Sequence, residues 1–257
     1  MSDVPEVRIG DGIDMPLVGF GTWQLGGQQA YDAVRWALEA GYRHIDTATM
    51  YGNEAEVGRA LHDSGLDRTD VFVTTKLPPG QVGHERDTLA ESLKGLGTDY
   101  VDLWLIHWPP RRSGYSVRVW REFVALRSEG LCRAIGVSNY DLAEIDELTA
   151  ATGETPVVNQ VPWSPAGHDQ RLLTAMRERG VVVEGYSPLR GTKLRDKTLR
   201  AIAERHGVTP AQVVLRWHVQ LGIVVIPKSA HRERIVSNFD LFGFSLSDEE
   251  MDRLSRL

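Results

Sequence analysis

The sequence predicts an α/β protein folded as a (β/α)8 TIM barrel, and three observations lead to this fold class. Short segments rich in Val and Ile alternate with longer amphipathic stretches, which is the pattern of parallel strands connected by helices. Eight such segments begin between Leu17 and Ile223, about 29 residues apart on average, close to the ~30 residues of a strand-helix-strand unit. The first segment leads into GTWQLGG, which lacks the GxGxxG spacing expected in an open dinucleotide-binding sheet.

The predicted strands follow one another at regular intervals. A turn dipeptide, Asp11-Gly12, precedes them between two short extended pieces, so we expect an N-terminal β-hairpin that closes the floor of the barrel. The predicted strands are LVGFG from Leu17, YRHIDT from Tyr42, VFVTTK from Val71, VDLWLIH from Val101, CRAIGVS from Cys132, VVNQV from Val157, VVVEGYS from Val181 and IVVIPKS from Ile223.

Glycines mark the predicted ends of the first helices. The stretch QQAYDAVRWALEAG ends at Gly41, NEAEVGRALHDSG opens with Asn53 as a candidate N-cap and ends at Gly65, and ERDTLAESLKGLG ends at Gly97. These stretches are the expected connections between the first four strands.

The C-terminal part of the chain predicts extra helices. The interval before the eighth strand contains two helical stretches, DKTLRAIAERHG and TPAQVVLRWHVQLG. After that strand we expect a helix near Arg232 to Ser237 and another opened by a Ser247 cap, with Glu250 three residues later. We see no linker, so residues 1–257 are expected to form a single domain.

The composition excludes several classes of protein. A net charge of −6 argues against general nucleic-acid binding. No apolar run approaches the ~18 residues of a membrane span, and MSDVPEVRIG does not resemble a secretory signal, so we expect a cytoplasmic protein without membrane association. The only cysteine, Cys132, excludes an intramolecular disulfide.

Polar side chains at three consecutive strand ends indicate a catalytic site. Asp46, Lys76 and His107 close the second, third and fourth predicted strands, and Tyr51 follows Asp46 by five residues. Each also has an ordinary structural role available. Asp46 can be a helix cap and Tyr51 can pack in a loop, whereas Lys76 can be a solvated strand end and His107 a hydrogen-bonded turn residue. Together, at the strand ends where barrel enzymes place reactive groups, they form a set capable of proton transfer to an oxygen.

The charges assign a role to each group. A tyrosine of pKa about 10 is a weak acid near neutral pH, and burial weakens it further. A lysine charge at ~4 Å contributes roughly 4 kcal/mol at an effective dielectric of ~20, so Lys76 is the expected activator of Tyr51. Asp46 then keeps Lys76 charged, and neutral His107 orients a substrate carbonyl by donating a hydrogen bond.

The sequence resembles the aldo-keto reductase superfamily over nearly its whole length. Its short loops are most similar to those of the bacterial 2,5-diketogluconate reductase group. The matching segments are GFGTW at 19–23, DTATMYGNEAEVG at 46–58, TTK ending at Lys76, LIHWP at 105–109, GVSNY at 136–140, NQ at 159–160, GYSPL at 185–189 and IPKS at 226–229. The resemblance implies reduction of aldehydes or ketones by NADPH, with Tyr51 as the proton donor and no metal. It also implies a monomer.

The resemblance further implies the ligand-binding residues. Those expected to bind the cofactor are Gly21, Thr22, Trp23, Asp46, Ser138, Asn139, Gln160, Tyr186, Ser187, Leu189, Pro227, Lys228, Ser229, Arg234 and Asn238. Those expected to bind the small-molecule aldehyde or ketone are Trp23, Tyr51, His107 and Trp108. The segment from 228 to 234 holds three basic residues against Glu233, which suits the 2′-phosphate. The remaining tryptophans are expected in the core or in helix packing, with Trp163 left open.

The sequence leaves two alternative functions and the role of one loop undecided. A nucleotide-binding sensor or interaction subunit on the same fold would bind NADPH with little turnover. A barrel metallohydrolase is motivated by His44, Asp46, His107 and Glu184, but the sequence has no HxH pair. Arg111 and Arg112 follow the fourth strand, where they either favour acidic substrates or, as we favour, are solvated.

Overall fold

The computed structural model describes residues 4–10, 12–110 and 114–257. Within these ranges eight parallel strands form one sheet in the order β10-β9-β8-β7-β6-β5-β4-β3. The strands are β3 (Phe20–Gly21), β4 (His44–Asp46), β5 (Phe72–Leu77), β6 (Val101–Ile106), β7 (Cys132–Ser138), β8 (Val158–Pro162), β9 (Val182–Tyr186) and β10 (Val224–Val225). Each falls within or overlaps a segment predicted from the sequence.

Backbone contacts close the sheet into a barrel. Val18 pairs with Val225 as a parallel bridge. The Gly19 amide donates to the Val225 carbonyl at 2.9 Å, and the Val225 amide donates to the Leu17 carbonyl at 2.9 Å. The first and last strands are therefore neighbours, which confirms the predicted (β/α)8 TIM barrel.

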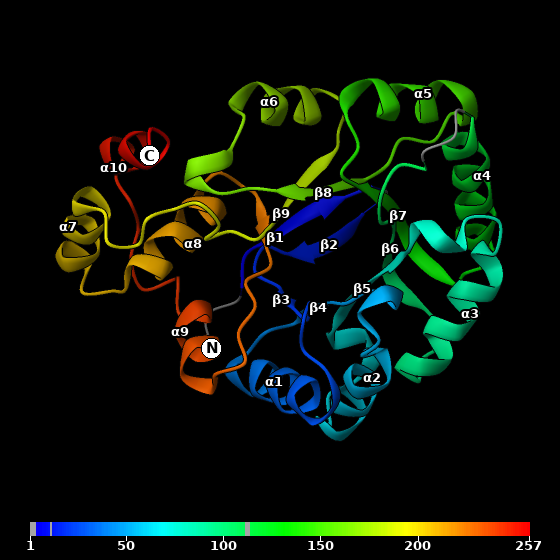
Figure 1. Cartoon of the computed structure of the whole chain (residues 1–257), viewed down its shortest axis with the longest axis horizontal. Coiled ribbons are helices and arrows are strands. Elements are labelled where there is room, and N and C mark those ends of the chain that lie inside the picture. The colour runs from blue at the N-terminus through cyan, green and yellow to red at the C-terminus, as the bar shows by residue number, and fades with distance from the viewer. Residues whose placement is uncertain (1–3, 11, 111–113) are drawn as a thin grey trace.

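Helices surround the strands and cover the outer face of the sheet (Figure 1). The α-helices are α1 (Gly27–Ala40), α2 (Glu54–Asp63), α3 (Glu85–Leu96), α4 (Tyr115–Ser128), α5 (Leu142–Thr152), α6 (Gln170–Glu178), α7 (Lys197–His206), α8 (Pro210–Gln220), α9 (Arg232–Phe239) and α10 (Asp248–Leu254). Short 3-10 turns are η1 (Thr49–Tyr51), η2 (Arg68–Asp70), η3 (Pro79–Gln81) and η4 (Pro165–Gly167). No helix in the described ranges is both long and apolar enough to traverse a bilayer.

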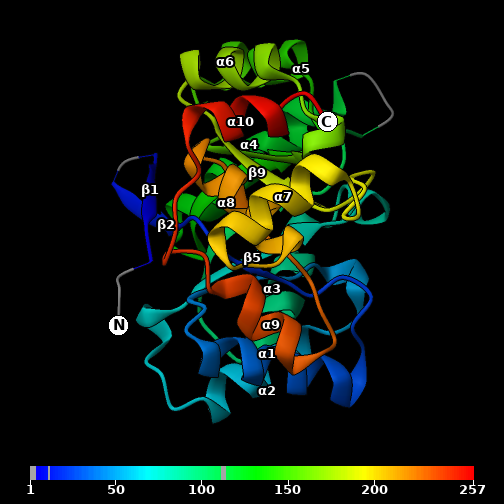
Figure 2. The ribbon, with the colours of Figure 1, turned by 90° about the vertical axis from the view of Figure 1, so that its left-hand side faces the viewer.

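The predicted N-terminal hairpin is present. Strands β1 (Glu6–Ile9) and β2 (Ile13–Pro16) pair in antiparallel register, although Asp11 of the predicted turn lies outside the described residues. Ile9 and Met15 are buried in the main core. Figure 2 shows the hairpin at one end of the barrel, with the loops that follow β5 and β9 at the other end. The hairpin therefore covers the floor and leaves the carboxyl ends of the strands open.

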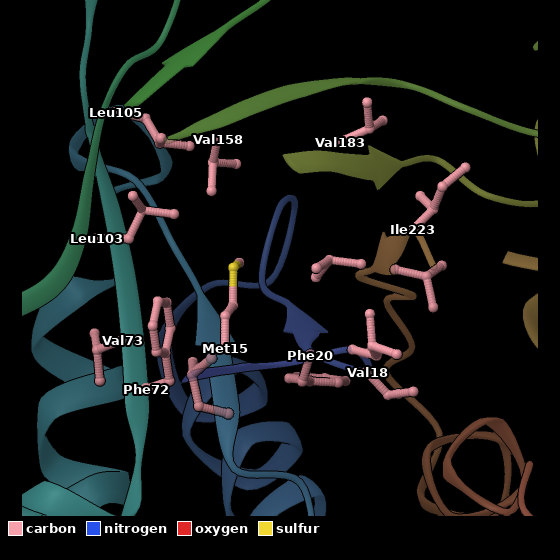
Figure 3. Packing of buried hydrophobic residues seen from close by; sticks show 14 of the residues in the cluster. Met15, Val18, Phe20, Phe72, Val73, Leu103, Leu105, Val158, Val183 and Ile223 are labelled. Atoms are coloured by element: carbon pink, nitrogen blue, oxygen red, sulfur yellow. The ribbon is translucent and has the colours of Figure 1, made fainter. Parts of the chain in front are cut away.

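Apolar side chains fill the barrel. Figure 3 shows Met15, Phe20, Leu103 and Val158 among the side chains that meet between the strands. The tryptophans expected in the core are found there: three are buried, Trp104, Trp120 and Trp217, and Trp36 is partly buried against the core. Trp163, whose place was left open, is also buried. Such packing fixes the positions from which the polar strand ends project.

The predicted helix ends agree with the structure except at α2. Gly41 and Gly97 end α1 and α3 in the left-handed region, at φ 111° and 66°. Ser247 and Glu250 form the predicted capping box of α10. Asn53 occupies the N-cap position of α2, but its side chain makes no capping bond and α2 ends at Asp63 rather than Gly65.

The reason for the missing cap is tertiary. The Asn53 amide group donates to the carbonyl oxygens of Thr22 at 3.0 Å and Leu25 at 2.8 Å. Its oxygen accepts from the Thr47 hydroxyl at 2.7 Å. Asn53 is fully buried and satisfies three partners from the loops around β3 and β4, which a local cap would leave unpaired.

Candidate active site

A cavity of about 540 Å³ opens at the carboxyl ends of the strands, where barrel proteins place their reactive groups. Fifteen of the residues predicted to bind cofactor or substrate, or to catalyse, line it. They are Gly21, Trp23, Asp46, Tyr51, His107, Trp108, Ser138, Asn139, Gln160, Tyr186, Ser187, Leu189, Pro227, Lys228 and Asn238. Trp23 and Trp108 are 55% and 44% exposed, as expected for walls of an open pocket.

Four predicted residues do not line the cavity. Lys76 and Thr22 are fully buried beneath it, and the Thr22 hydroxyl donates to the Asp46 carbonyl at 3.0 Å. The Ser229 hydroxyl accepts from the His231 amide at 3.0 Å, just before α9. Arg234 is exposed in the first turn of α9. The first two support the cavity from below, whereas Ser229 and Arg234 lie at the start of a helix beside it.

A buried ion pair forms the base of the site. The Lys76 ammonium lies 2.7 Å from both carboxylate oxygens of Asp46 and 2.8 Å from the Thr47 carbonyl. Burial by itself lowers the Lys76 pKa, but the negative charge of Asp46 and the Tyr51 phenol beside it raise the pKa above its ordinary value. Lys76 is therefore charged at neutral pH, as the sequence predicted from the role of Asp46.

Tyr51 lies over this pair, at the end of η1. The Lys76 ammonium is 5.1 Å from the centre of the Tyr51 ring. Burial raises the pKa of the Tyr51 phenol, the Lys76 charge lowers it, and Asp46 raises it, with a net increase. The expected direction of the lysine effect is present, but burial outweighs it in this state, so the phenol holds its proton.

His107 is neutral at physiological pH. Burial, followed by the charge of Lys76, lowers its pKa to about 3. Its ring centre lies 5.8 Å from that of Tyr51, with the two planes at 75°. Its buried Nδ1 has no hydrogen-bond partner among the described residues. The neutral imidazole has one N–H donor and one nitrogen acceptor, and its predicted role as a donor to the substrate stays a prediction.

A second set of side chains lies at the ends of β7, β8 and β9. The Ser138 hydroxyl donates to the Gln160 carbonyl at 2.8 Å. The Asn139 amide donates to the His107 carbonyl at 3.2 Å and to the Ser138 hydroxyl at 2.9 Å, and the Tyr186 hydroxyl donates to Asn139 Oδ1 at 2.8 Å. These bonds hold Tyr186 and Asn139 in a fixed relation beside Gln160.

Sequence reasoning missed several lining residues. Gln24, Met50, Pro188, Arg190 and Ile226 also line the cavity. Met50, Pro188 and Ile226 lie within the matching segments, and Gln24 and Arg190 directly follow one, so position in or beside a motif was the available signal. Met50 is next to Tyr51 and is strongly exposed, and Arg190 follows the GYSPL segment and adds a positive charge.

The metal alternative finds no support in the geometry. Across the described ranges, no group of three or more His, Cys, Asp or Glu side chains is placed to hold a metal ion. Glu184, one of the residues that motivated this alternative, instead accepts a hydrogen bond from Gln160 at 2.9 Å. Arg111 and Arg112, considered for acidic substrates, lie outside the described residues.

The cavity fits a phosphorylated nicotinamide dinucleotide by the chemistry of its lining. The side-chain oxygen of Gln160 accepts no hydrogen bond from the described residues, so it is free for an external amide donor. The aromatic ring of Tyr186 lines the same wall. Lys228 and Arg190 supply the positive charge that phosphate groups require.

The family model of the Aldo/keto reductase family matches residues 17–257. The chain therefore belongs to the aldo/keto reductase family, which confirms the resemblance found in the sequence. This membership places it among the NADP-dependent oxidoreductases, and aldo/keto reductases act on small-molecule carbonyl compounds.

Relatives of known name agree with this membership. An aldo-keto reductase of Mycolicibacterium smegmatis is 44% identical over 256 residues, covering 98% of this chain and 93% of its own length. The methylglyoxal reductase DkgA of Escherichia coli is 39% identical over 260 residues, covering 100% and 94%.

Solved structures show the same fold. The crystal structure of an aldo/keto reductase from Brucella melitensis has a TM-score of 0.96 and 44% identity, and the match covers 99% of each chain. An aldo-keto reductase from Bombyx mori in complex with NADP has a TM-score of 0.93 and 34% identity, covering 100% of this chain and 93% of that one.

Proposed function

We propose that this protein reduces aldehydes or ketones to alcohols with NADPH, using Tyr51 as the general acid. The observation that carries the proposal is the placement of the Tyr51 ring 5.1 Å from an ammonium that is itself ion-paired with buried Asp46. NADPH, when bound, supplies a hydride to the carbonyl carbon. The protein must then deliver a proton to the carbonyl oxygen.

Tyr51 meets the two requirements of a general acid. Its raised pKa keeps the phenol protonated at neutral pH before reaction. As the proton leaves, the charge of the fully buried Lys76 stabilises the forming phenolate. Asp46 serves this step indirectly, because its carboxylate keeps Lys76 charged and holds its nitrogen in place.

His107 and the two exposed tryptophans complete the substrate side. A neutral imidazole beside the Tyr51 ring can donate one hydrogen bond to the carbonyl oxygen and so orient it toward the phenol. Trp23 and Trp108 offer aromatic walls for the rest of the molecule. Such a pocket favours small carbonyl compounds with apolar or aromatic substituents.

The cofactor residues act by binding and orientation. Gln160, with Ser138 and Asn139, would hold the nicotinamide carboxamide, and Tyr186 would stack on the ring. The phosphate-bearing parts would lie against Ser187, Leu189, Lys228 and the adjoining residues Thr22, Pro227, Ser229, Arg234 and Asn238. We further propose that the protein works as a monomer in the cytoplasm, which light scattering of the purified protein and cell fractionation would test.

The decisive experiment is Tyr51→Phe. Because the phenol oxygen is lost and little else changes, aldehyde reduction should fall by roughly 10²-fold or more. The dissociation constant for NADPH, measured by quenching of tryptophan fluorescence, should stay within about threefold of the wild type, since a threefold change corresponds to less than 1 kcal/mol.

Two results would contradict the proposal. Unchanged turnover in Tyr51→Phe would remove the assigned acid. Tight NADPH binding by the wild type, without consumption of NADPH across a panel of aldehydes and ketones, would favour the sensor or interaction subunit instead.

A further inference from the structure

A buried carboxyl group contacts Gln160, which lines the cavity, and takes no part in the proposed proton transfer. Glu184 lies on β9 and is fully buried. Its backbone is in register with that of Gln160 on β8, so both side chains lie on the same face of the sheet. The Gln160 amide nitrogen donates to Glu184 Oε2 at 2.9 Å.

The same nitrogen has a second carboxyl acceptor. It also donates to Asp46 Oδ2 at 2.8 Å. A primary amide has two N–H bonds, and both are used by these carboxyl groups from β4 and β9. The Gln160 oxygen is thereby turned away from the carboxyl groups, and Gln160 itself lines the cavity.

We propose that Glu184 is a positioning residue, which locks the side-chain amide of Gln160 so that its oxygen faces the cavity as the acceptor for the nicotinamide carboxamide. The inference rests on the proposed function, because it assigns Gln160 to the cofactor. A flipped amide would place its oxygen against the Asp46 carboxylate and would take the N–H donors away from both Asp46 Oδ2 and Glu184 Oε2. Glu184, together with Asp46, thus sets which way the nicotinamide carboxamide is held, and with it the face of the ring turned to the substrate.

The surroundings of Glu184 permit a conservative replacement. Its second oxygen has no hydrogen-bond partner and lies 3.7 Å from His44 Nε2, which is also 3.1 Å from the Thr74 hydroxyl. The charged or titratable groups around it are His44 and Asp46 from β4, Lys76 from β5 and Tyr51 from η1. A glutamine at 184 can offer its oxygen to Gln160 and its amide nitrogen toward His44.

The test compares Glu184→Met, which keeps the length and removes the acceptor, with Glu184→Gln, which keeps an acceptor. In Glu184→Met the NADPH dissociation constant should rise about three- to tenfold, as expected for loss of one hydrogen bond. Deuterium transfer from NADPH labelled at one or the other C4 position should become measurably less selective for one face, because only the Asp46 bond still holds the Gln160 amide. Glu184→Gln should restore both readouts to near wild type.

Asp102→Leu provides the matched control. Asp102 is a buried carboxyl on β6 that pairs with Arg68 and Arg133 rather than with Gln160. Its replacement should lower the melting temperature without changing NADPH affinity or the face of transfer. A purely structural role for Glu184 predicts that Glu184→Met behaves like this control.

The outcomes separate the inference from the proposed function. Wild-type protein that neither binds NADPH nor reduces carbonyl compounds overturns the proposed function. An active wild type with Glu184→Met unchanged, or with Glu184→Gln as impaired as Glu184→Met, overturns the inference alone. If Glu184→Met does not fold, nuclear magnetic resonance of the wild type decides, because both side-chain amide protons of Gln160 must be protected from solvent exchange and rapid exchange refutes the lock.

Discussion

Single residues in this protein serve tertiary contacts that local sequence rules do not reveal. Asn53 was predicted as a helix cap from its place at the start of NEAEVGRALH, and the structure uses it to join the segments around β3 and β4. Asp46, Tyr51, Lys76 and His107 were recognisable because chemically reactive types recur at strand ends. Glu184 was noticed only as a metal candidate, because its partnership with Gln160 depends on the register between β8 and β9.

At the residue scale we predict that Asn53→Ala costs about 3 kcal/mol of folding free energy, because it removes three buried hydrogen bonds. Asp141→Ala removes a conventional capping box at the start of α5, which is worth about 1 kcal/mol. Urea denaturation of both variants measures the difference. Equal losses would show that Asn53 is no more than a cap.

The packing of α2 against α3 depends on how closely their backbones approach each other. Gly58 of α2 faces the end of α3, and a Cβ atom built on it would lie 2.5 Å from the Leu96 carbonyl oxygen. Gly95, on α3, faces α2 with more space, since its nearest neighbour would be Glu54 Cβ at 3.5 Å. Both glycines look alike in the sequence as weak positions within a helix, and only the helix packing distinguishes them.

At the element scale we therefore predict opposite effects for the same substitution. Gly58→Ala should destabilise the protein by about 1 to 3 kcal/mol, because backbone atoms cannot move aside cheaply. Gly95→Ala should be neutral or stabilising by up to about 1 kcal/mol, because alanine favours the helix. Melting temperatures of the two variants provide the measurement, and a stabilised Gly58→Ala would contradict the packing argument.

The whole barrel buries ionisable groups whose protonation differs between the folded and unfolded chain. Burial lowers the pKa of His44 and His107 to about 3 and that of His218 to about 4. The unfolded chain binds these protons near pH 6.5, so folding stability falls as the pH drops below that value. Burial, followed by the charge of Asp46, raises the pKa of Glu184 to about 8.

The titration of Glu184 changes the folding stability in the opposite direction with pH. The folded chain keeps its proton up to about pH 8, whereas the unfolded chain loses it near pH 4.5, so its contribution to stability declines as the pH rises between these values. At the scale of the molecule we predict that the melting temperature falls from pH 6.5 to 8.5, and falls less in Glu184→Gln. Calorimetry at constant ionic strength measures this, and parallel curves would exclude Glu184 as the source.

The sequence by itself determined the barrel, its eight strands, most helix ends and most residues that line the cavity, because hydrophobic periodicity, glycine stops and strand-end motifs are local signals. Tertiary structure alone decided that Asn53 joins two loops, that burial outweighs Lys76 at the Tyr51 phenol, and that Gln160 is held between two carboxyl groups. These features depend on distances between strands far apart in the chain and on exclusion of water. No local pattern of residues encodes either quantity.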